Sequence, residues 1–490
     1  MKLIFSKQYK GHVKIGKILA LPCLLFYLSS LAWGAPVPDF AISPADVRFS
    51  PNGPVEGQSV IITADVLNKG GETQADIDVR FFEGTIDSSG LQIGKGAVIV
   101  GLRSGEKGKV EAKWRARSGP VNIYVVVDPD NAIAEVDETN NQAVRVITGQ
   151  TLALPKATPA QIETAIQKGI KWLRTQQGEF IVLCPDGHGN PQFMELCMIC
   201  RKPLKGGKVE KFDDERTHGG WHPIIGPGAT ALALMTLLHA GVPESDAVVV
   251  DGIDYLLNKT PVPDWNQWDD SYDFAAAILG LTATGNKEKY LTRVSFAMKR
   301  LLSMQRHRGW GYGAYPDMAH MHYVLLALYA AQKWGLDVPE EALKGSADWI
   351  SGMQREDGGW SYAGIEVTSP WADTSYGSMT ATALMGLKIC GVPPTAPAFQ
   401  KGLEWLNRHY TITSNPGAYE WHYYYLLALQ RALTIPPEPS QIGEHNWYNE
   451  GAAFFLSQQK PDGSWRGGDQ EDPIISTCFV ILFLKKALPL

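Results

Sequence analysis

The stretch KGSADWISGMQREDGGW, residues 344–360, recurs in related form along the last two thirds of the chain. One further copy is GAAFFLSQQKPDGSW at residues 451–465, and another joins LLSMQ at 301–305 to GWGYG at 309–313. Each copy reads as a helix, then a glutamine, then a glycine-rich turn closed by a tryptophan. Repetition at this scale indicates that the whole region is built from one supersecondary unit.

The physical chemistry of each copy fits a helix that ends in a tight turn. Glycine supplies the positive φ that such a turn requires. A glutamine side chain at the helix end reaches backbone groups that the helix leaves without a partner. The tryptophan is expected to pack back over the turn.

A second, more apolar segment follows each copy, so the region is predicted to hold six pairs of an outer and an inner helix. Most inner segments are rich in Ala, Leu, Met and Ile on nearly every face, as buried helices are. The outer segments begin near residues 168, 251, 294, 344, 401 and 450, and the inner segments span 229–241, 271–285, 320–335, 377–391, 422–433 and 476–488. Six pairs closed into a ring make an all-α (α/α)6 toroid, with an open α-solenoid as the alternative. The ring is favoured because the last pair carries no polar capping repeat.

The pattern Lys-Gly-x-x-Trp-Leu, followed by Gln and then Asp-Gly-x-Trp, resembles the QW repeats of the prenyltransferase and squalene-cyclase superfamily. The first part of this pattern stands at residues 168–173 and 401–406. The resemblance extends over residues 160–490. It implies the toroid fold for this region, whereas one fold hosts many activities.

Residues 1–34 show the three-part pattern of a secretory signal peptide. Lysines precede an apolar run at residues 18–31, and Ala32 and Gly34 are the small residues that a signal peptidase requires. Cleavage after Gly34 is expected, with an uncleaved anchor as the alternative. The apolar run is short for a spanning helix, so the mature protein is predicted to be extracytoplasmic, periplasmic or secreted, with no integral membrane span.

Residues 37–148 are predicted to form a small Ig-like β-sandwich, because short alternating runs are separated by turn residues. The stretch VVDPDNAIAEVDETNN at residues 126–141 resembles the signature of the CARDB family, an adhesion-type Ig-like fold. Its acidic residues suit Ca²⁺, but the favoured interpretation is turn chemistry, in which Asp and Asn bond to nearby backbone. A linker at residues 149–159 leads to the helical region.

The bulk composition excludes one class of partner. The formal net charge is −6 and the chain has no basic tract, so nucleic-acid binding is not expected. Of six cysteines, five remain after signal removal. An odd number in an exported protein argues against a simple disulfide framework.

An insert at residues 178–218 separates the first outer helix from its closing Gly-Gly-Trp turn. It offers the soft ligands that tetrahedral Zn²⁺ prefers, in the order Cys184, His188, Cys197 and Cys200, with His218 as the alternative fourth ligand. A structural zinc site is the leading hypothesis. A disulfide between Cys184 and Cys197 or Cys200, or free thiols without a role, remain open.

The starts of the inner segments carry acidic, imidazole and phenol groups, which a ring would bring to one end of its bore. A concave apolar cavity with such groups is a default functional site. The candidate catalytic residues are Asp269, Asp373, His320, His322 and His422, and the candidate ligand-binding residues are Asp270, Asp273, Tyr376 and Tyr423. The alternative is that they are ordinary helix caps and first-turn residues.

The resemblance to class II terpene cyclases implies an Asp-x-Asp-Asp acid, which this chain matches only in part. Residues 267–270 read QWDD, and Ala372 stands at the position of the proton donor in residues 370–374. Two hypotheses therefore remain. The first is an exported protein whose toroid binds a hydrophobic small molecule or a cell-envelope partner. The second is an enzyme of the terpene cyclase or prenyltransferase type, or one that acts on a glycan.

Overall fold

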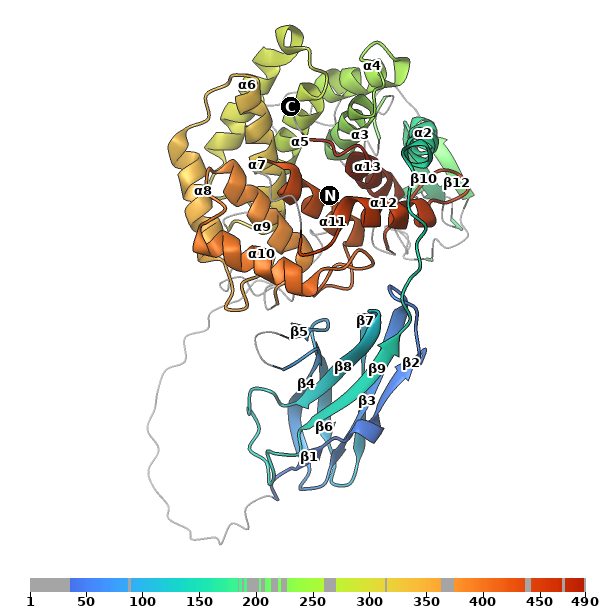
Figure 1. Cartoon of the computed structure of the whole chain (residues 1–490), viewed down its shortest axis with the longest axis vertical. Helices are drawn as coiled ribbons and strands as arrows, with labels where there is room; N and C mark the ends of the chain where they lie inside the picture. The colour runs from blue at the N-terminus through green and yellow to red at the C-terminus, as the bar shows by residue number, and fades with distance from the viewer. Residues whose placement is uncertain are drawn as a thin grey trace.

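The computed structural model describes residues 36–86, 90–183, 185–186, 189–191, 202–203, 208–212, 219–221, 227–259, 270–312, 315–362, 374–436, 442–468 and 472–488. A β-sheet domain comes first and a ring of helices follows it (Figure 1). The prediction of a signal peptide at residues 1–34 lies outside the described residues. No helix within the described ranges has the length and apolarity that a membrane crossing needs.

The first domain is the predicted Ig-like sandwich of two antiparallel sheets. One sheet holds β1 (Phe40–Ala41), β2 (Val47–Ser50), β3 (Ser59–Asn68) and β7 (Lys107–Arg115), and the other holds β4 (Thr73–Glu83), β5 (Leu91–Gln92), β6 (Ala97–Leu102), β8 (Gly119–Val127) and β9 (Gln142–Gly149). Strand β3 shows how the sequence selects the fold. Its alternate residues Val60, Ile62, Ala64 and Val66 are all 0% exposed, so one face enters the core and the other meets solvent.

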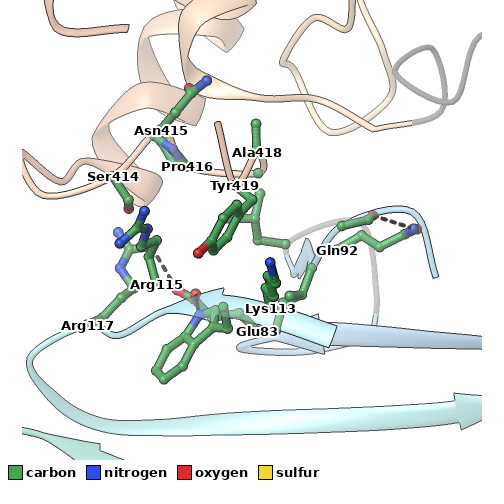
Figure 2. A pocket seen from close by; sticks show the side chains of 15 residues that line it. Glu83, Gln92, Lys113, Arg115, Arg117, Ser414, Asn415, Pro416, Ala418 and Tyr419 are labelled. Atoms are coloured by element: carbon green, nitrogen blue, oxygen red, sulfur yellow. Dashed lines mark hydrogen bonds and ion pairs between the residues drawn. The ribbon is translucent and has the colours of Figure 1, made fainter. Parts of the chain in front are cut away.

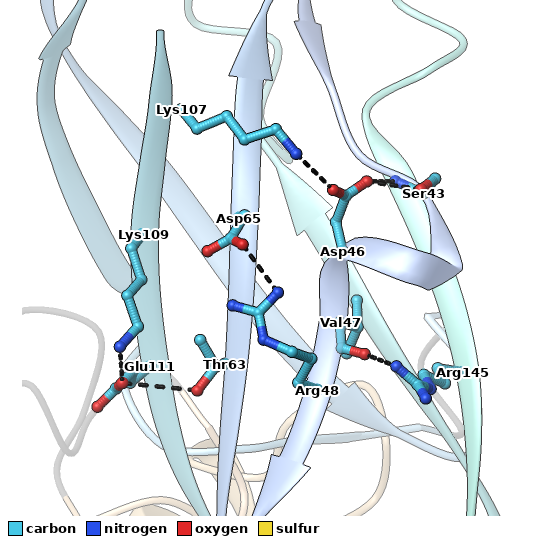
Figure 3. A network of polar contacts seen from close by, with 10 residues as sticks. All are labelled: Ser43, Asp46, Val47, Arg48, Thr63, Asp65, Lys107, Lys109, Glu111 and Arg145. Carbon is cyan, nitrogen blue, oxygen red and sulfur yellow. Dashed lines mark hydrogen bonds and ion pairs between the residues drawn. The ribbon is translucent and has the colours of Figure 1, made fainter.

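The solvent face of the β3 sheet is covered by polar pairs (Figure 3). Lys107 reaches Asp46 at 2.9 Å, and Arg48 reaches Asp65 at 2.8 Å. These pairs are exposed, and exposed ion pairs contribute little to stability. Their value is to keep this face of the sheet polar.

The acidic stretch at residues 128–138 behaves as the turn interpretation predicts. Asp128 accepts the backbone N–H groups of Ala132 and Ile133, and Asp137 accepts that of Thr139. Glu135 accepts the backbone N–H of Phe40, and its pKa is raised to about 7, mainly by burial. The two aspartates therefore hold the local backbone in place, and Glu135 ties this stretch to β1.

The helical region forms the predicted (α/α)6 toroid, in which helices alternate between an outer and an inner ring (Figure 1). The outer helices are α2 (Pro159–Thr175), α4 (Ala247–Asp254), α6 (Lys287–Ser303), α8 (Glu340–Gly352), α10 (Pro397–His409) and α12 (Trp447–Gln458). The inner helices are α3 (Pro227–His239), α5 (Ser271–Thr282), α7 (Met318–Lys333), α9 (Gly377–Ile389), α11 (His422–Thr434) and α13 (Pro473–Leu484). A π-helical turn, Tyr255–Lys259, continues α4.

The inner helices close into a ring rather than an open solenoid. Each packs against the next, and α13 packs against α3 as well as α11. The outer ring closes in the same place, because α12 packs against α2. Helix α6 begins at Lys287, earlier than the expected residue 294, since the Asn286 side chain caps it by accepting the Lys289 N–H.

The tryptophan of each complete repeat is buried and locks the turn to its own outer helix. Trp221, Trp310, Trp360 and Trp465 each donate Nε1–H to a carbonyl near the end of that helix, at 2.9, 2.7, 2.7 and 2.7 Å. The accepting carbonyls lie in or near the last turn of the helix, and those of Leu173, Leu301 and Ile350 also accept the backbone N–H three residues further on. The predicted packing of tryptophan over the turn is therefore confirmed as a specific hydrogen bond.

In four of the repeats, a glutamine after the outer helix joins that repeat to the next. Gln177, Gln305, Gln354 and Gln459 donate Nε2–H to backbone carbonyls of the following outer helix: Val248, Ala342, Ala398 and Ala165 respectively. The last of these bonds joins the sixth repeat to α2, the first helix of the ring. The same kind of glutamine hydrogen bond thus contributes both to repeat stacking and to ring closure.

The insert in the first repeat contains strands that the sequence did not predict. β10 (Glu179–Leu183) pairs antiparallel with β11 (Gly189–Pro191) and with β12 (Lys208–Phe212). Its two ends meet where the Gly178 N–H donates to the Gly220 carbonyl at 2.7 Å. The insert is thus a three-stranded addition to an intact QW turn.

The two domains meet at the loop between α10 and α11 (Figure 2). Arg117 donates to the carbonyls of His409 and Tyr410 at 2.9 and 3.0 Å, and it also pairs with Glu83 at 2.8 Å. The Tyr419 hydroxyl lies 3.0 Å from Ser59 Oγ, and Arg115 stacks over its ring at 4.7 Å. Polar contacts therefore attach the sandwich to the toroid.

Candidate ligand site in the toroid

The centre of the candidate site is an aspartate–histidine pair at the start of inner helix α7. Asp317 Oδ1 accepts the backbone N–H of His320 at 2.9 Å, and its Oδ2 lies 2.6 Å from Nδ1 of the same residue. Because a carboxylate only accepts, Nδ1 carries the hydrogen of this bond. The two residues are 4% and 1% exposed. Asp317 therefore fixes the orientation of the imidazole.

The other nitrogen of His320 faces a second carboxylate. Nε2 lies 3.9 Å from Asp270 Oδ1, just beyond a direct hydrogen bond. Asp270 caps α5 by accepting the Tyr272 N–H at 2.9 Å. Asp270 and Asp317 are thus helix caps, as the alternative interpretation holds, and they also place negative charge on both sides of one imidazole.

Aromatic rings enclose this imidazole. The Tyr272 ring is 3.8 Å from that of His320 between centroids, and the Tyr312 ring stands edge-on at 4.3 Å. Tyr312 is 37% exposed, so the group reaches the surface through it. We call this group the Asp317 cluster: it comprises Asp270, Tyr272, Tyr312, Asp317 and His320, together with three tyrosines that the charge of Asp317 influences, Tyr362, Tyr376 and Tyr424.

All five tyrosines of the Asp317 cluster share one electrostatic feature. The pKa of each tyrosine is raised mainly by burial, and the negative charge of Asp317 is among the further causes. This holds for Tyr272, Tyr312, Tyr362, Tyr376 and Tyr424. Within the described ranges no lysine or arginine pairs with Asp317. The cluster therefore combines neutral, electron-rich rings with the buried carboxylate of Asp317, whose partner in the described residues is His320, and such an environment attracts a cation.

His322 belongs to a different environment, although it is two residues from His320. Its Nε2 is 2.5 Å from a terminal nitrogen of Arg431, and its Nδ1 is 2.9 Å from Thr382 Oγ1. An arginine only donates, so Nε2 accepts and Nδ1 carries the hydrogen. Burial, and then the charge of Arg431, hold the pKa of His322 well below its usual range. We call these three residues the Arg431 centre.

The structure places His422 and Tyr423 against outer helix α12. His422 Nε2 donates to the Ile412 carbonyl at 2.8 Å, and its ring is 5.0 Å from that of Phe454. Burial lowers the pKa of His422 to about 3. Tyr423 stacks edge-on against Phe455 at 5.0 Å. These two residues thus pack between helices, whereas the ring of the next residue, Tyr424, lies 5.1 Å from that of His322.

The remaining candidates divide into described and undescribed positions. Asp273, in the first turn of α5, adds to the charge that raises the pKa of Tyr312. The cyclase-like candidates and the proposed metal ligands fall outside the described residues, so they stay predictions: Asp269, Asp373, Cys184, His188, Cys197, Cys200 and His218.

Several members of the site were not predicted from the sequence, and two of them have a recognisable signal. Tyr312 and Tyr362 each stand two residues after the tryptophan of a QW turn, in the patterns GWGY and GWSY. The recurrence of Trp-x-Tyr in two repeats marks a shared position on the turn. Tyr272, Tyr323, Tyr424 and Arg431 lie within apolar helices and carry no comparable signal.

Comparison with known families matches both domains. The CARDB family matches residues 37–145, and the squalene-hopene cyclase C-terminal domain family matches residues 250–425. The second range contains every member of the Asp317 cluster. The chain thus carries a CARDB domain at its N-terminus, followed by a toroid of the squalene-cyclase repeat type.

Similar individual proteins cover only part of the chain. A squalene–hopene cyclase from Bradyrhizobium diazoefficiens is 25% identical over 193 residues, which are 36% of this chain and 29% of that protein. The type II terpene cyclase MstE from Scytonema is 13% identical, with 67% of this chain and 98% of that chain covered and a TM-score of 0.40. A CARDB domain from Pyrococcus furiosus, in complex with di-metal ions, is 20% identical over 24% of this chain and 96% of its own, with a TM-score of 0.20.

Proposed function

We propose that this protein is an exported binding protein whose toroid holds a small amphipathic ligand with its cationic group in the Asp317 cluster. The observation that carries this proposal is the buried Asp317–His320 pair, which the rings of Tyr272 and Tyr312 cover and to which no lysine or arginine pairs in the described residues. A cation over aromatic faces gains more when the site is shielded from water. The adjacent carboxylates add direct charge attraction.

The test compares a cation with its neutral isostere. Choline and 3,3-dimethylbutan-1-ol have the same shape, and differ in whether the central atom is a charged nitrogen or a carbon. In calorimetry of the full mature chain we expect choline to bind at least about 10-fold more tightly, because a shielded cation–aromatic contact contributes about 2 kcal/mol. Equal affinity for both compounds, or no binding of choline, would contradict the proposal.

Two aspartate variants make this test specific. Asp317→Asn keeps a cap acceptor for α7 and removes the charge, so it should reduce the preference for choline to the part that the aromatic rings supply. Asp472→Asn is the matched control, since Asp472 caps inner helix α13 in the same way, by accepting the N–H groups of Ile474 and Ile475. It should leave the preference intact.

The CARDB domain supports an extracytoplasmic role as a presenting module. The polar attachment of Arg117 and Tyr419 would hold the toroid at a set orientation to the sandwich. N-terminal sequencing of the mature protein should begin at Ala35. An intact Met1 in the soluble cytoplasmic fraction would contradict export.

An acid-catalysed cyclase is the second candidate, and a specific observation favours it. Asp270 and His320 face each other at 3.9 Å inside the range that matches the squalene-hopene cyclase family. Protonation of an alkene creates a carbocation, which the same tyrosines would stabilise. Incubation with squalene and analysis of the lipid extract by mass spectrometry tests this candidate. Cyclised product from the wild type and none from Asp270→Asn would favour it over simple binding, whereas unchanged squalene with both would exclude it for this substrate.

A further inference from the structure

Arg431 is an arginine buried in the middle of the toroid without an acidic partner. It lies on α11, is 1% exposed, and belongs to the largest fully buried side chains. In the part of the chain that the structure describes, no carboxylate forms an ion pair with it. Burying a charge is costly unless the charge is paired and hydrogen-bonded.

In the described residues, four ionisable groups that act on or contact Arg431 are neutral: His322, His239, Tyr323 and Tyr424. His322 accepts a hydrogen bond from it and cannot supply negative charge. Burial, and then Arg431 itself, lower the pKa of His239 to about 4. Burial raises the pKa of Tyr323, so this phenol keeps its proton although Arg431 acts against the shift. The protein groups around the guanidinium therefore leave its charge unbalanced.

Two hydrogen-bond donors at this place lack a partner. The Nε of Arg431 and the hydroxyl of Tyr323 are both buried and make no hydrogen bond. Tyr323 lies on α7 beside His322, with the two ring centroids 4.9 Å apart. A buried polar atom without a partner costs about 1–3 kcal/mol. Unpaired donors beside an unpaired positive charge are the donor set of an anion site.

A second buried cation shows that this fold satisfies such groups elsewhere. Lys388 on α9 is 5% exposed, and its Nζ donates to the carbonyls of Ala432 and Ile435 at 2.7 and 2.8 Å. These carbonyls lie at the C-terminal end of α11, where the helix dipole is negative. Arg431 precedes this end in the same helix and receives no comparable contact from it.

We propose that the Arg431 guanidinium and the Tyr323 hydroxyl hold a small monovalent anion in the centre of the toroid. The anion is a halide or a carboxylate, and it reaches the site either as a free ion or as the acidic group of a larger molecule. This site adjoins the Asp317 cluster, since the ring of Tyr323 lies 5.6 Å from that of Tyr272, but it requires a ligand of the opposite charge. A bound anion would supply both the missing hydrogen bonds and the missing charge.

The test is thermal unfolding of the full mature chain in a gluconate buffer, because gluconate is too bulky to enter the site. Chloride or acetate then replaces gluconate at constant ionic strength. An anion that binds only the folded state should raise the unfolding midpoint of the toroid by several degrees, on the order of 5 °C at saturation. A rise with chloride identifies a free ion, and a rise with acetate alone identifies a carboxylate group. No rise with either anion overturns the proposal.

Three variants assign the effect to this site. Arg431→Met should abolish the anion dependence and be no less stable than the wild type in gluconate, because an apolar replacement of a lone buried charge is often neutral or stabilising. Lys388→Met is the matched control, which should lower the midpoint and keep the anion dependence. If Arg431→Met does not fold, Tyr323→Phe takes its place in the test. The affinity for the anion should then be about 10-fold weaker, because one hydrogen bond to a charged partner is lost. An undiminished anion effect in Arg431→Met or, where that variant does not fold, in Tyr323→Phe would contradict the proposal.

Discussion

His320 and His322 stand two residues apart on the same inner helix, and both are buried, yet their surroundings have opposite charge. His320 is held between Asp317 and Asp270, among tyrosine rings. His322 accepts from Arg431, and its pKa lies well below the usual range. Two residues correspond to about 200° around a helix, so the two rings meet different neighbours. The partners of a buried histidine, and not its place in the sequence, therefore decide its charge environment and the ligand it can help to bind.

The largest loss of stability is expected from removing the carboxylate that holds His320. Asp317→Ala removes the cap of α7 and leaves buried His320 without its carboxylate. Loss of one partner from a buried pair costs about 3–5 kcal/mol, which we expect as the fall in unfolding free energy measured with denaturant. Asp317→Asn retains a cap acceptor and should cost less. A loss below about 1 kcal/mol for Asp317→Ala would show that the pair contributes little.

On the basic side, His322→Leu should have a smaller effect. It removes the acceptor of the Arg431 hydrogen bond and leaves the guanidinium with less support, at a cost of about 2–3 kcal/mol. The double variant with Arg431→Met should lose less than the sum of the single losses, because residues in contact are not additive. Strict additivity in a double-mutant cycle would mean that the two side chains are not coupled.

The smallest effect on stability is expected from a third buried histidine, which tests whether a histidine in this environment is neutral. His422 has a pKa of about 3 when folded, against about 6.5 when unfolded. The unfolded chain therefore binds more protons below pH 6.5, so stability falls as the pH falls. Between pH 7 and pH 5 this residue alone should contribute a loss of about 2 kcal/mol. His422→Gln should show that much less acid sensitivity, and equal pH profiles for variant and wild type would contradict the neutral assignment.

The toroid could be predicted from the sequence because its determinants are local and repeated. Each QW turn brings its own glutamine and tryptophan, and the same two kinds of hydrogen bond recur around the ring. Ring closure follows from the bond of Gln459 to Ala165, which obeys the same rule as the bonds between neighbours. The β-sandwich was predictable for a related reason, since alternation along β3 already marks its buried face.

The candidate site could be predicted only in part, because rotation about each inner helix decides which residues meet. His320 and Tyr376 at helix starts do join the Asp317 cluster. At the start of α11, however, His422 and Tyr423 turn toward α12 and Tyr424 turns toward His322 on α7, a difference of about 100° per residue that apolar sequence does not reveal. The contact between His322 and Arg431 joins residues 109 positions apart. Such pairs depend on the closed ring and have no local signature.

The most direct test of the central claim is a crystal structure of the full mature chain grown with choline. We predict that the trimethylammonium group lies within about 6 Å of the centroids of the cluster's tyrosine rings, beside the Asp317 carboxylate, in the wild type and not in Asp317→Asn. Choline bound elsewhere, or a tyrosine cluster that remains closed around His320 at saturating choline, would contradict the account.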